Sequence, residues 1–183
     1  GKIIHLTVAK TEFIPDLYYV KRERMKQKVI YFHGLESGQG GPKVDFLAKK
    51  YEVIAPEMNY HDPKEFEKTL HMVKCLQAGQ RHKPELIIGS SMGGYFAYMI
   101  ATHTNIPVVL LNPALHSREF EPQGVSQGPH EVEGTLILGA KDDVIDPVKT
   151  TEMLKESIKN GQLKSYLRDH GHRTPLKIFE DYL

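Results

Sequence analysis

The sequence has very little cysteine. Of its 183 residues only Cys75 carries a thiol, which excludes an internal disulfide framework and any zinc site built from several cysteines. Stable disulfides accumulate in oxidising compartments, so this scarcity favours a reducing compartment, and we expect a cytoplasmic protein. Because Cys75 falls in the middle of a predicted helix, away from any strand end, we expect it to be packed and to have no catalytic role.

Long apolar runs and an excess of charge of one sign are also missing. No apolar stretch approaches the roughly 20 residues that a membrane-spanning helix needs. Lys and Arg together number 24 against 23 Asp and Glu, which gives a formal net charge of +1. Such a chain has no broad field that attracts nucleic acid or anionic lipid, so we expect neither nucleic acid nor a membrane among its partners.

The overall composition is that of an ordinary folded protein. Hydrophobic residues make up 40% and charged residues 26% of the chain, without the bias typical of disordered segments. A chain of this length can bury a sheet between two helical layers but is short for two domains. We therefore expect a single domain over residues 1–183.

Strand-forming segments dominate the start of the sequence, and strands then alternate with helices. Residues 3–9 and 17–22 predict two antiparallel strands, ahead of a buried strand at 29–32 that ends at His33-Gly34. Further strands are expected at 51–55, 86–88, 108–111, 136–138 and 165–167. Helices are expected at 43–50, from Asp62-Pro63 to about 76, at 95–101, from Asp146-Pro147 to 158 and from Thr174-Pro175 onward.

This alternation predicts the fold class. Strands separated by helices cannot pair through tight turns, so we expect an α/β fold with a mostly parallel sheet and helices on both faces. Ligands of such sheets bind beyond the carboxyl ends of the strands. The only long irregular stretch, residues 117–133, is rich in Gly, Pro and Gln, and we expect it to border the site. Only about 20 residues separate Pro113 from Gly134, which leaves room for a minimal cap.

A serine stands where the strand at 86–88 ends and the next helix begins, in the pattern Gly89-x-Ser91-x-Gly93. Glycines on both sides permit the sharp turn of a nucleophile elbow, which lifts the serine hydroxyl above the sheet. The alternatives are a phosphate-binding loop or a plain tight turn. Neither Gly-x-x-x-x-Gly-Lys-Ser/Thr nor Gly-x-Gly-x-x-Gly after a strand occurs, so Ser91 is the candidate nucleophile.

A serine nucleophile needs an acid and a base, which follow an elbow in the order serine, acid, histidine. Asp142 stands at the exit of the strand at 136–138 and is the candidate acid. Asp143 is adjacent, and Asp146 fits an N-cap before Pro147. Turn and cap chemistry is therefore the alternative explanation of this acidic cluster.

Two histidines follow the last predicted strand. His172 is the candidate base, because Gly171 permits a close approach of its loop to the elbow. His170 lies nearer the strand and is the alternative, either as the base or as a residue that stabilises the loop. A metal bound by His170 and His172 is a rival chemistry, but His-x-His without a nearby carboxylate motif gives it little support, so we expect no metal.

Two backbone N–H groups should stabilise the oxyanion of the reaction. One belongs to the residue after the nucleophile, Met92, and the other to the loop after the strand at 29–32. Gly34 lets that loop approach, which makes the N–H of Leu35 the second candidate donor. A simple strand-terminating turn is the other explanation of His33-Gly34.

These motifs together resemble the α/β-hydrolase superfamily over residues 28–183: His33-Gly34, Gly89-Ser90-Ser91-Met92-Gly93-Gly94, Gly139-x-x-Asp142 and Gly171-His172. The short chain, and Leu111-Asn112-Pro113-Ala114 after the elbow, are most similar to the small bacterial YqiA-like esterases. The resemblance implies a compact α/β-hydrolase fold and the hydrolysis of an ester, thioester or amide without a metal or organic cofactor. The two predicted N-terminal strands are a departure from the smallest of these esterases.

We therefore expect a serine hydrolase that cleaves small or polar acyl esters through an acyl-enzyme, with Ser91, His172 and Asp142 as its triad. Its partner would be a small-molecule, ester-like substrate. A thioesterase, acyltransferase or peptidase with the same triad is an alternative, since pocket shape selects the leaving group. A non-catalytic binding protein of the same fold is another.

Overall fold

The structure, a computed structural model, describes residues 26–79, 81–125 and 131–183. The antiparallel strands expected at 3–9 and 17–22 lie outside these residues. The described residues form one sheet of six parallel strands in the order β2-β1-β3-β4-β5-β6. The strands are β1 (Lys28–Phe32), β2 (Glu52–Ile54), β3 (Pro84–Ser90), β4 (Val108–Leu111), β5 (Gly134–Gly139) and β6 (Leu163–Arg168).

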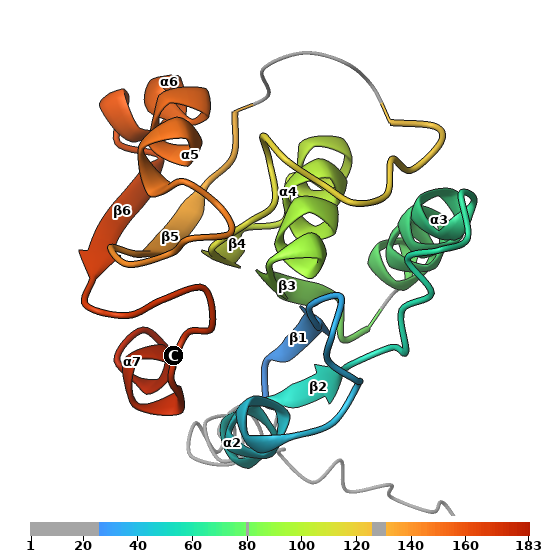
Figure 1. The fold of residues 1–183 in the computed structure, drawn as a ribbon. Helices are drawn as coiled ribbons and strands as arrows, with labels where there is room; N and C mark the ends of the chain where they lie inside the picture. The colour runs from blue at the N-terminus through green and yellow to red at the C-terminus, as the bar shows by residue number, and fades with distance from the viewer. Residues whose placement is uncertain (1–25, 80, 126–130) are drawn as a thin grey trace, which may run out of the picture.

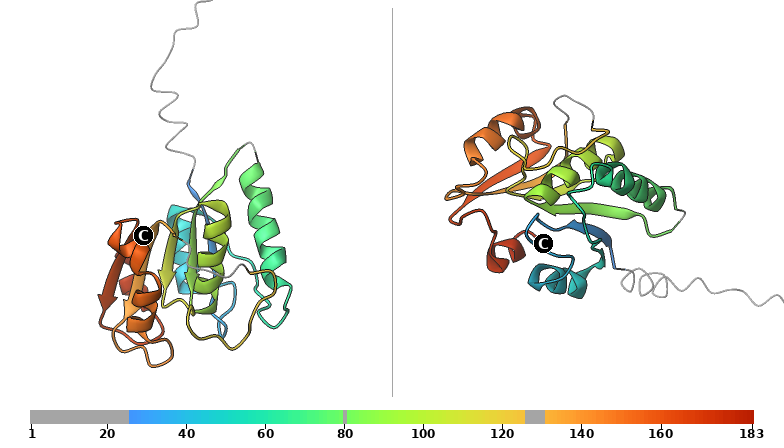
Figure 2. Two further views of the ribbon diagram at one scale, coloured as in Figure 1. Left: turned by 90° about the horizontal axis from the view of Figure 1, so that it is seen from above. Right: turned by 45° about the vertical axis from the view of Figure 1, so that its right-hand side comes forward.

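Helices cover both faces of this sheet (Figures 1 and 2). One face carries α2 (Pro42–Lys50) and α7 (Leu176–Glu180). The other carries α3 (Glu65–Ala78), α4 (Met92–Thr104), α5 (Pro147–Met153) and α6 (Lys155–Lys159). The α/β fold with a parallel sheet between helical layers, predicted from the alternation of elements, is confirmed.

The first described strand shows how the sequence serves both layers. In β1, Val29 and Tyr31 pack in the core under α2 and α7, whereas Ile30 and Phe32 pack in the core under α3 and α4. Successive side chains of a strand point to opposite faces, so a strand covered on both sides must be apolar throughout. All four of these side chains are buried.

The order of the strands creates a binding crevice. The chain leaves β1 for β2 on one side and returns to β3 on the other side of β1. Parallel sheets bind ligands at the carboxyl ends of the strands where the order reverses in this way. The loop after β1 and the turn after β3 meet there, because a Cβ built on Gly34 would lie 3.7 Å from the Cβ of Ser91.

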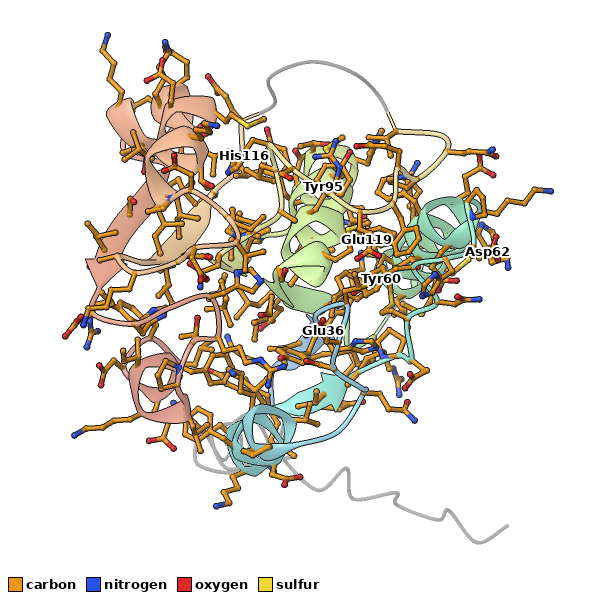
Figure 3. All side chains as sticks on the ribbon, in the orientation of Figure 1. Glu36, Tyr60, Asp62, Tyr95, His116 and Glu119 are labelled. Atoms are coloured by element: carbon orange, nitrogen blue, oxygen red, sulfur yellow. The ribbon has the colours of Figure 1, made fainter. Side chains whose placement is uncertain are left out.

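Helix α3 begins at Glu65, three residues later than the Asp62-Pro63 start predicted from the sequence. Asp62 instead closes a turn (Figure 3): its N–H donates to the Asn59 carbonyl at 3.0 Å, and its Oδ1 accepts from the N–H of Lys64 at 2.9 Å. Aspartate before proline readily forms such a turn as well as a helix cap. The short-range sequence pattern does not distinguish the two.

The helix predicted from Asp146 to residue 158 is divided at Leu154 into α5 and α6. Leu154 has φ −104° and ψ 11°, and its side chain is buried in the core. The predicted N-cap is confirmed, since Asp146 Oδ1 accepts from the N–H of Val148 at 2.8 Å.

Cys75 is exposed on α3, so the expectation that it is packed is wrong. Its Sγ lies 3.5 Å from Nε2 of His71, one helical turn away. The cytoplasmic location expected from the scarcity of cysteine stays a prediction. Among the helices of the described residues, none combines the length and the apolar character that a membrane span requires.

The segment between β4 and β5 forms no helix or strand in its described residues, 112–125 and 131–133. Arg118 fastens it to α4, with its guanidinium carbon 4.0 Å from the centroid of the Tyr95 ring, and Nη1 donates to the Leu115 carbonyl at 2.5 Å. Phe120 packs against His61 with ring centroids 4.3 Å apart. This cap is a loop folded down onto the helices that follow β2 and β3 (Figure 3).

Candidate active site

Ser91 occupies a strained turn between β3 and α4. Its φ is 54° and its ψ is −115°, a conformation that few residues other than glycine adopt. Three hydrogen bonds hold the turn: the Ser91 N–H donates to the Leu111 carbonyl at 2.9 Å, and the Ser91 carbonyl accepts from Tyr95 at 3.1 Å and Ala114 at 2.9 Å. The strain is therefore held by the ends of β4 and α4.

The two glycines of the motif are required by close backbone contacts. A Cβ on Gly89 would lie 2.2 Å from the Gly93 carbonyl oxygen, and a Cβ on Gly93 would lie 2.2 Å from the carbonyl oxygen of Phe32. Any side chain at either position would push the first turn of α4 away from β1 and β3. This spacing is what the elbow pattern in the sequence predicts.

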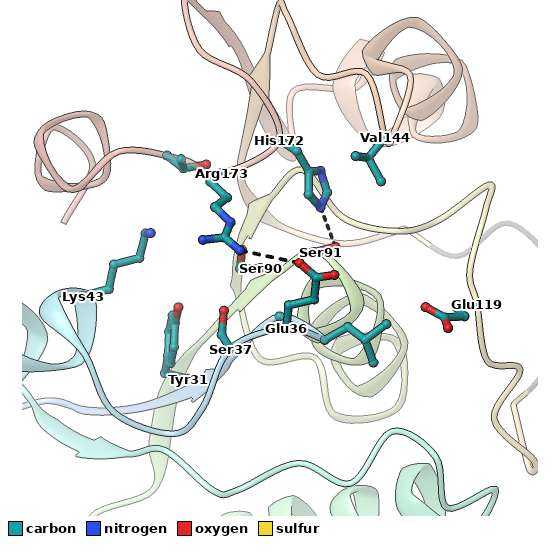
Figure 4. A pocket seen from close by; sticks show the side chains of 13 residues that line it. Tyr31, Glu36, Ser37, Lys43, Ser90, Ser91, Glu119, Val144, His172 and Arg173 are labelled. Atoms are coloured by element: carbon teal, nitrogen blue, oxygen red, sulfur yellow. Dashed lines mark hydrogen bonds and ion pairs between the residues drawn. The ribbon is translucent and has the colours of Figure 1, made fainter.

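The structure brings Ser91, His172 and Asp142 together, and Figure 4 shows Ser91 and His172 with the hydrogen bond between them. Ser91 Oγ lies 2.8 Å from His172 Nε2, and His172 Nδ1 lies 2.9 Å from Asp142 Oδ2. A carboxylate at Nδ1 favours the tautomer that carries its proton there, which leaves Nε2 free to accept a proton from the serine hydroxyl.

The carboxyl group of Asp142 is fixed on both oxygens. Its side chain has no solvent exposure. Oδ1 accepts from the N–H groups of Val144 and Ile145, both at 2.9 Å. The second oxygen, Oδ2, is thereby held toward the imidazole of His172.

The alternative residues lie elsewhere. His170 is buried, and its Nδ1 lies 2.7 Å from the carbonyl oxygen of Gly171. Asp143 is exposed. One reason given for favouring His172 is not supported, because a Cβ on Gly171 would meet nothing closer than the Lys141 carbonyl at 3.7 Å, an ordinary contact.

The loop after β1 is fastened below Ser91 by His33. Nε2 of His33 accepts from the N–H of Met58 at 3.0 Å, and its carbonyl accepts from the hydroxyl of Tyr60 at 2.5 Å. Neither the N–H of Leu35 nor that of Met92 donates to a protein acceptor among the described residues. Both donors that the sequence suggested are therefore available to a ligand at Ser91.

Asn112 is a residue of the site that the sequence analysis did not single out. It is buried at the end of β4. Its Nδ2 donates to the carbonyls of His172 at 2.7 Å and Gly171 at 3.4 Å, and its Oδ1 accepts from the N–H of Gly139 at 2.7 Å. One amide thus joins the loop that carries the histidine to the strand that leads to Asp142.

A sequence signal for Asn112 does exist. A polar side chain directly after an all-apolar strand has left the hydrophobic layer at the edge where ligands bind. Its φ of 41° adds a second reason, since asparagine tolerates the left-handed region better than most residues.

A pocket of about 360 Å³ opens beside Ser91 (Figure 4). It is lined by residues from the loop after β1, from α2, from the elbow and from the histidine loop. Glu119 also lines it, which confirms that the irregular stretch 117–133 borders the site. Lys43 and Arg173, two basic residues in its wall, were not anticipated from the sequence. Among the described residues no three His, Cys, Asp or Glu side chains are grouped as metal ligands would be.

Comparison with protein families gives one match. The family UPF0227, described as an uncharacterised protein family, matches residues 28–127 of the chain. No curated protein sequence matches the chain.

Solved structures share the fold. An esterase of Pyrococcus furiosus superposes with a TM-score of 0.66 at 18% identity, over 86% of this chain and 79% of its own. A dienelactone hydrolase of Anabaena variabilis gives 0.57 at 14%, over 87% and 83%. Acyl-protein thioesterase 2 of Zea mays gives 0.54 at 17%, over 86% and 90%. These likenesses establish the fold, and the compact α/β-hydrolase fold expected from the sequence is confirmed.

We predict that substitutions can separate the two roles of the Asn112 amide, which are donation to the histidine loop by Nδ2 and acceptance from the Gly139 N–H by Oδ1. Asn112→Ala should lower the free energy of unfolding by about 2 to 4 kcal/mol, because it leaves buried donors and acceptors unpaired. It should also expose the Gly139 N–H to faster hydrogen exchange. Asn112→Asp keeps an acceptor for Gly139 but puts a carboxylate oxygen against the His172 carbonyl, so it should destabilise while Gly139 stays protected.

Urea unfolding and amide exchange followed by NMR measure both effects. Ser157→Ala is the matched control, because Ser157 Oγ is a buried acceptor for the N–H of Val132, far from the histidine loop. It should destabilise without changing exchange at Gly139. Equal protection of Gly139 in the Ala and Asp variants would contradict the assignment.

Proposed function

The chain belongs to the uncharacterised protein family UPF0227, and we propose that it is a serine hydrolase that cleaves carboxylic esters through an acyl-enzyme. The observation that carries the proposal is the hydrogen-bonded series Ser91, His172 and Asp142, mounted on a strained elbow. Such a series activates a hydroxyl that is otherwise a poor nucleophile.

The proposed reaction has two halves, formation of the acyl-enzyme and its hydrolysis, and both use the same groups. Ser91 Oγ attacks the ester carbonyl carbon while His172 Nε2 takes its proton, and Asp142 stabilises the imidazolium that forms. The N–H groups of Leu35 and Met92 stabilise the tetrahedral oxyanion. The C–O bond to the alcohol then breaks, and His172 returns the proton to the departing oxygen. A water molecule, deprotonated by His172, cleaves the acyl-enzyme and regenerates Ser91.

A non-catalytic binding protein is the less well supported alternative. Backbone strain at Ser91 lowers stability by about 1–3 kcal/mol, and a protein that only binds its ligand gains nothing from that conformation. Among the residues that the structure describes, the buried acid Asp142 likewise hydrogen-bonds only to His172 and to its own turn. Thioester and amide cleavage use the same groups, and the pocket decides between them.

We predict that a fluorophosphonate labels Ser91 and that Ser91→Ala abolishes labelling. Turnover of a p-nitrophenyl ester should fall by about a thousandfold or more, since the remaining site retains only its oxyanion donors and binding contacts. Mass spectrometry of the labelled peptide and the steady-state rate measure the two effects. Ser165→Ala is the control, because Ser165 is exposed on β6 and does not line the pocket. Undiminished turnover in Ser91→Ala would exclude the mechanism.

We predict that substitutions of the two histidines, and of the two neighbouring aspartates, lower kcat unequally. His172→Ala should lower kcat by about a thousandfold and His170→Ala by far less, because only His172 reaches Ser91 Oγ. Asp142→Asn should be comparably damaging, since an amide at Nδ1 favours the wrong tautomer, whereas the exposed Asp143 should tolerate the same change. The kcat values of the four variants decide the assignment, and the opposite order in either pair would reassign that role.

We predict a preference for short or polar acyl groups. The cap is a loop without helices in its described residues, and exposed residues such as Glu36, Ser37 and Arg173 line the pocket. A deep apolar tunnel, which long acyl chains need, is therefore not part of the described site. The values of kcat/KM for p-nitrophenyl esters should decline as the acyl chain lengthens. The hydrolysis rate should also show no sudden rise when the ester concentration passes its critical micelle concentration. A maximum at long chains would show that a larger apolar site forms.

A further inference from the structure

One end of the pocket beside Ser91 is positively charged. Lys43, the second residue of α2, lines the pocket and is half-buried. No acidic side chain pairs with it among the described residues, and its Nζ lies 5.9 Å from the centroid of the Phe179 ring. Burial, and then repulsion from Arg173, lower the pKa of Lys43. An anion placed there would relieve both penalties.

The N-terminus of α2 adds to this positive potential. No side-chain hydrogen bond caps the first turn, whose one acidic residue is the exposed Asp45. The backbone dipole places partial positive charge at this end of the helix. Lys43 therefore stands where its own charge and that of the helix reinforce each other. The effect on an anion is largest within the first turn.

Arg173 is the second cation of this end. It directly follows His172, so its position is tied to the triad. Its guanidinium lies 3.5 Å from the carboxylate of Glu36, but both side chains are more than 80% exposed. Exposed pairs of this kind are weak, so a substrate anion can replace Glu36 at little cost.

Hydroxyl groups complete this wall of the pocket. Tyr31, Ser37 and Ser90 line it together with the two cations (Figure 4). Burial raises the pKa of Tyr31 to about 12, so its hydroxyl keeps its proton at neutral pH and remains a donor. A carboxylate accepts several hydrogen bonds at once, and this wall offers donors of the right kind.

Two acidic residues also line the pocket. Glu36 and Glu119 are both exposed, whereas Lys43 is half-buried. Figure 4 shows Glu119 on the side of Ser91 opposite to Lys43. Solvent screens the exposed acids more than the partly buried cation, so the Lys43 end retains a positive potential.

We propose that the substrate is an ester bearing a second, anionic group, a carboxylate, which Lys43 and Arg173 bind while the ester carbonyl lies at Ser91. This inference rests on the proposed esterase function and specifies its substrate class. The carboxylate can belong to the acyl part or to the alcohol part of the ester. Either way it forms charge-assisted hydrogen bonds in a partly desolvated pocket, where they are stronger than in water.

Matched substrate pairs test the proposal in the intact chain. For the acyl side, the p-nitrophenyl monoesters of adipic and sebacic acid are compared with the same compounds methylated on the free carboxyl group. For the alcohol side, 4-carboxyphenyl acetate is compared with its methyl ester. Each kcat/KM is divided by the rate of alkaline hydrolysis of the same compound. We expect the anionic member of at least one pair to be favoured about tenfold, a preference that declines as salt is added.

Variants connect this preference to the two cations. Lys43→Met and Arg173→Gln should each lower the ratio of anionic to neutral kcat/KM by about fivefold to tenfold, and the double variant should abolish the preference. Lys49→Met removes an exposed lysine from the same helix, outside the pocket, and should leave the ratio unchanged. Lys43→Arg keeps the charge and should restore most of the preference, which separates loss of charge from damage to α2.

The outcomes are distinct. A wild-type enzyme that treats both members of every pair alike would overturn the proposal, as would a preference that survives the double variant. Either result leaves the proposed esterase function intact if turnover of the neutral esters still depends on Ser91. Absence of Ser91-dependent turnover for every ester would instead contradict the proposed function itself.

Discussion

The site depends on how closely the first turn of α4 lies against the ends of β1 and β3. At Gly93 the backbone of α4 approaches the Phe32 carbonyl so closely that a Cβ would lie 2.2 Å from it. This contact leaves Ser91 no relaxed conformation, and the hydrogen bonds to Leu111 and Ala114 hold it at a φ of 54°. The same contact keeps Met92, the residue before Gly93, close to the loop after β1, because a Cβ on Gly93 would also lie 2.5 Å from the carbonyl oxygen of His33.

A second close contact serves the other half of the triad. At the end of β5, a Cβ on Gly139 would lie 2.3 Å from the Gly171 carbonyl oxygen, so the histidine loop packs directly on the strand that leads to Asp142. Asn112 reinforces this contact from β4 with hydrogen bonds to both segments. Neighbouring parallel strands end at one edge of the sheet, so residues far apart in the chain are brought within hydrogen-bonding distance there.

The sequence was sufficient for the features that local chemistry determines. Apolar runs that alternate with helical segments predicted the parallel strands. The glycines around Ser91 predicted the elbow, and an elbow implies that the acid and then the histidine follow it in the chain. Long-range packing was needed for the rest. The break at Leu154 arises because its side chain fills the core, and no capping residue marks that position. The exposure of Cys75 depends on which face of α3 packs against α4, and the residues next to Cys75 in the sequence do not indicate that face.

The positive charge in the pocket could not be predicted from the sequence, because it also depends on long-range packing. The packing that produces it is different from the packing that forms the elbow. Lys43 and Arg173 are separated by most of the chain and come together because α2 and α7 pack on the same face of the sheet.

That packing has its own contacts: the rings of Phe46 and Phe179 meet edge to face with centroids 6.0 Å apart, and Lys50 Nζ donates to the carbonyl of Leu183 at the end of the chain. None of these groups takes part in the contacts that hold Ser91, which lie at the ends of β1, β3, β4 and α4. Lys43 and the nucleophile are thus supported by separate interactions, whereas Arg173 directly follows His172. A change in the α2 and α7 layer can therefore alter which substrates the pocket accepts while the elbow stays in place.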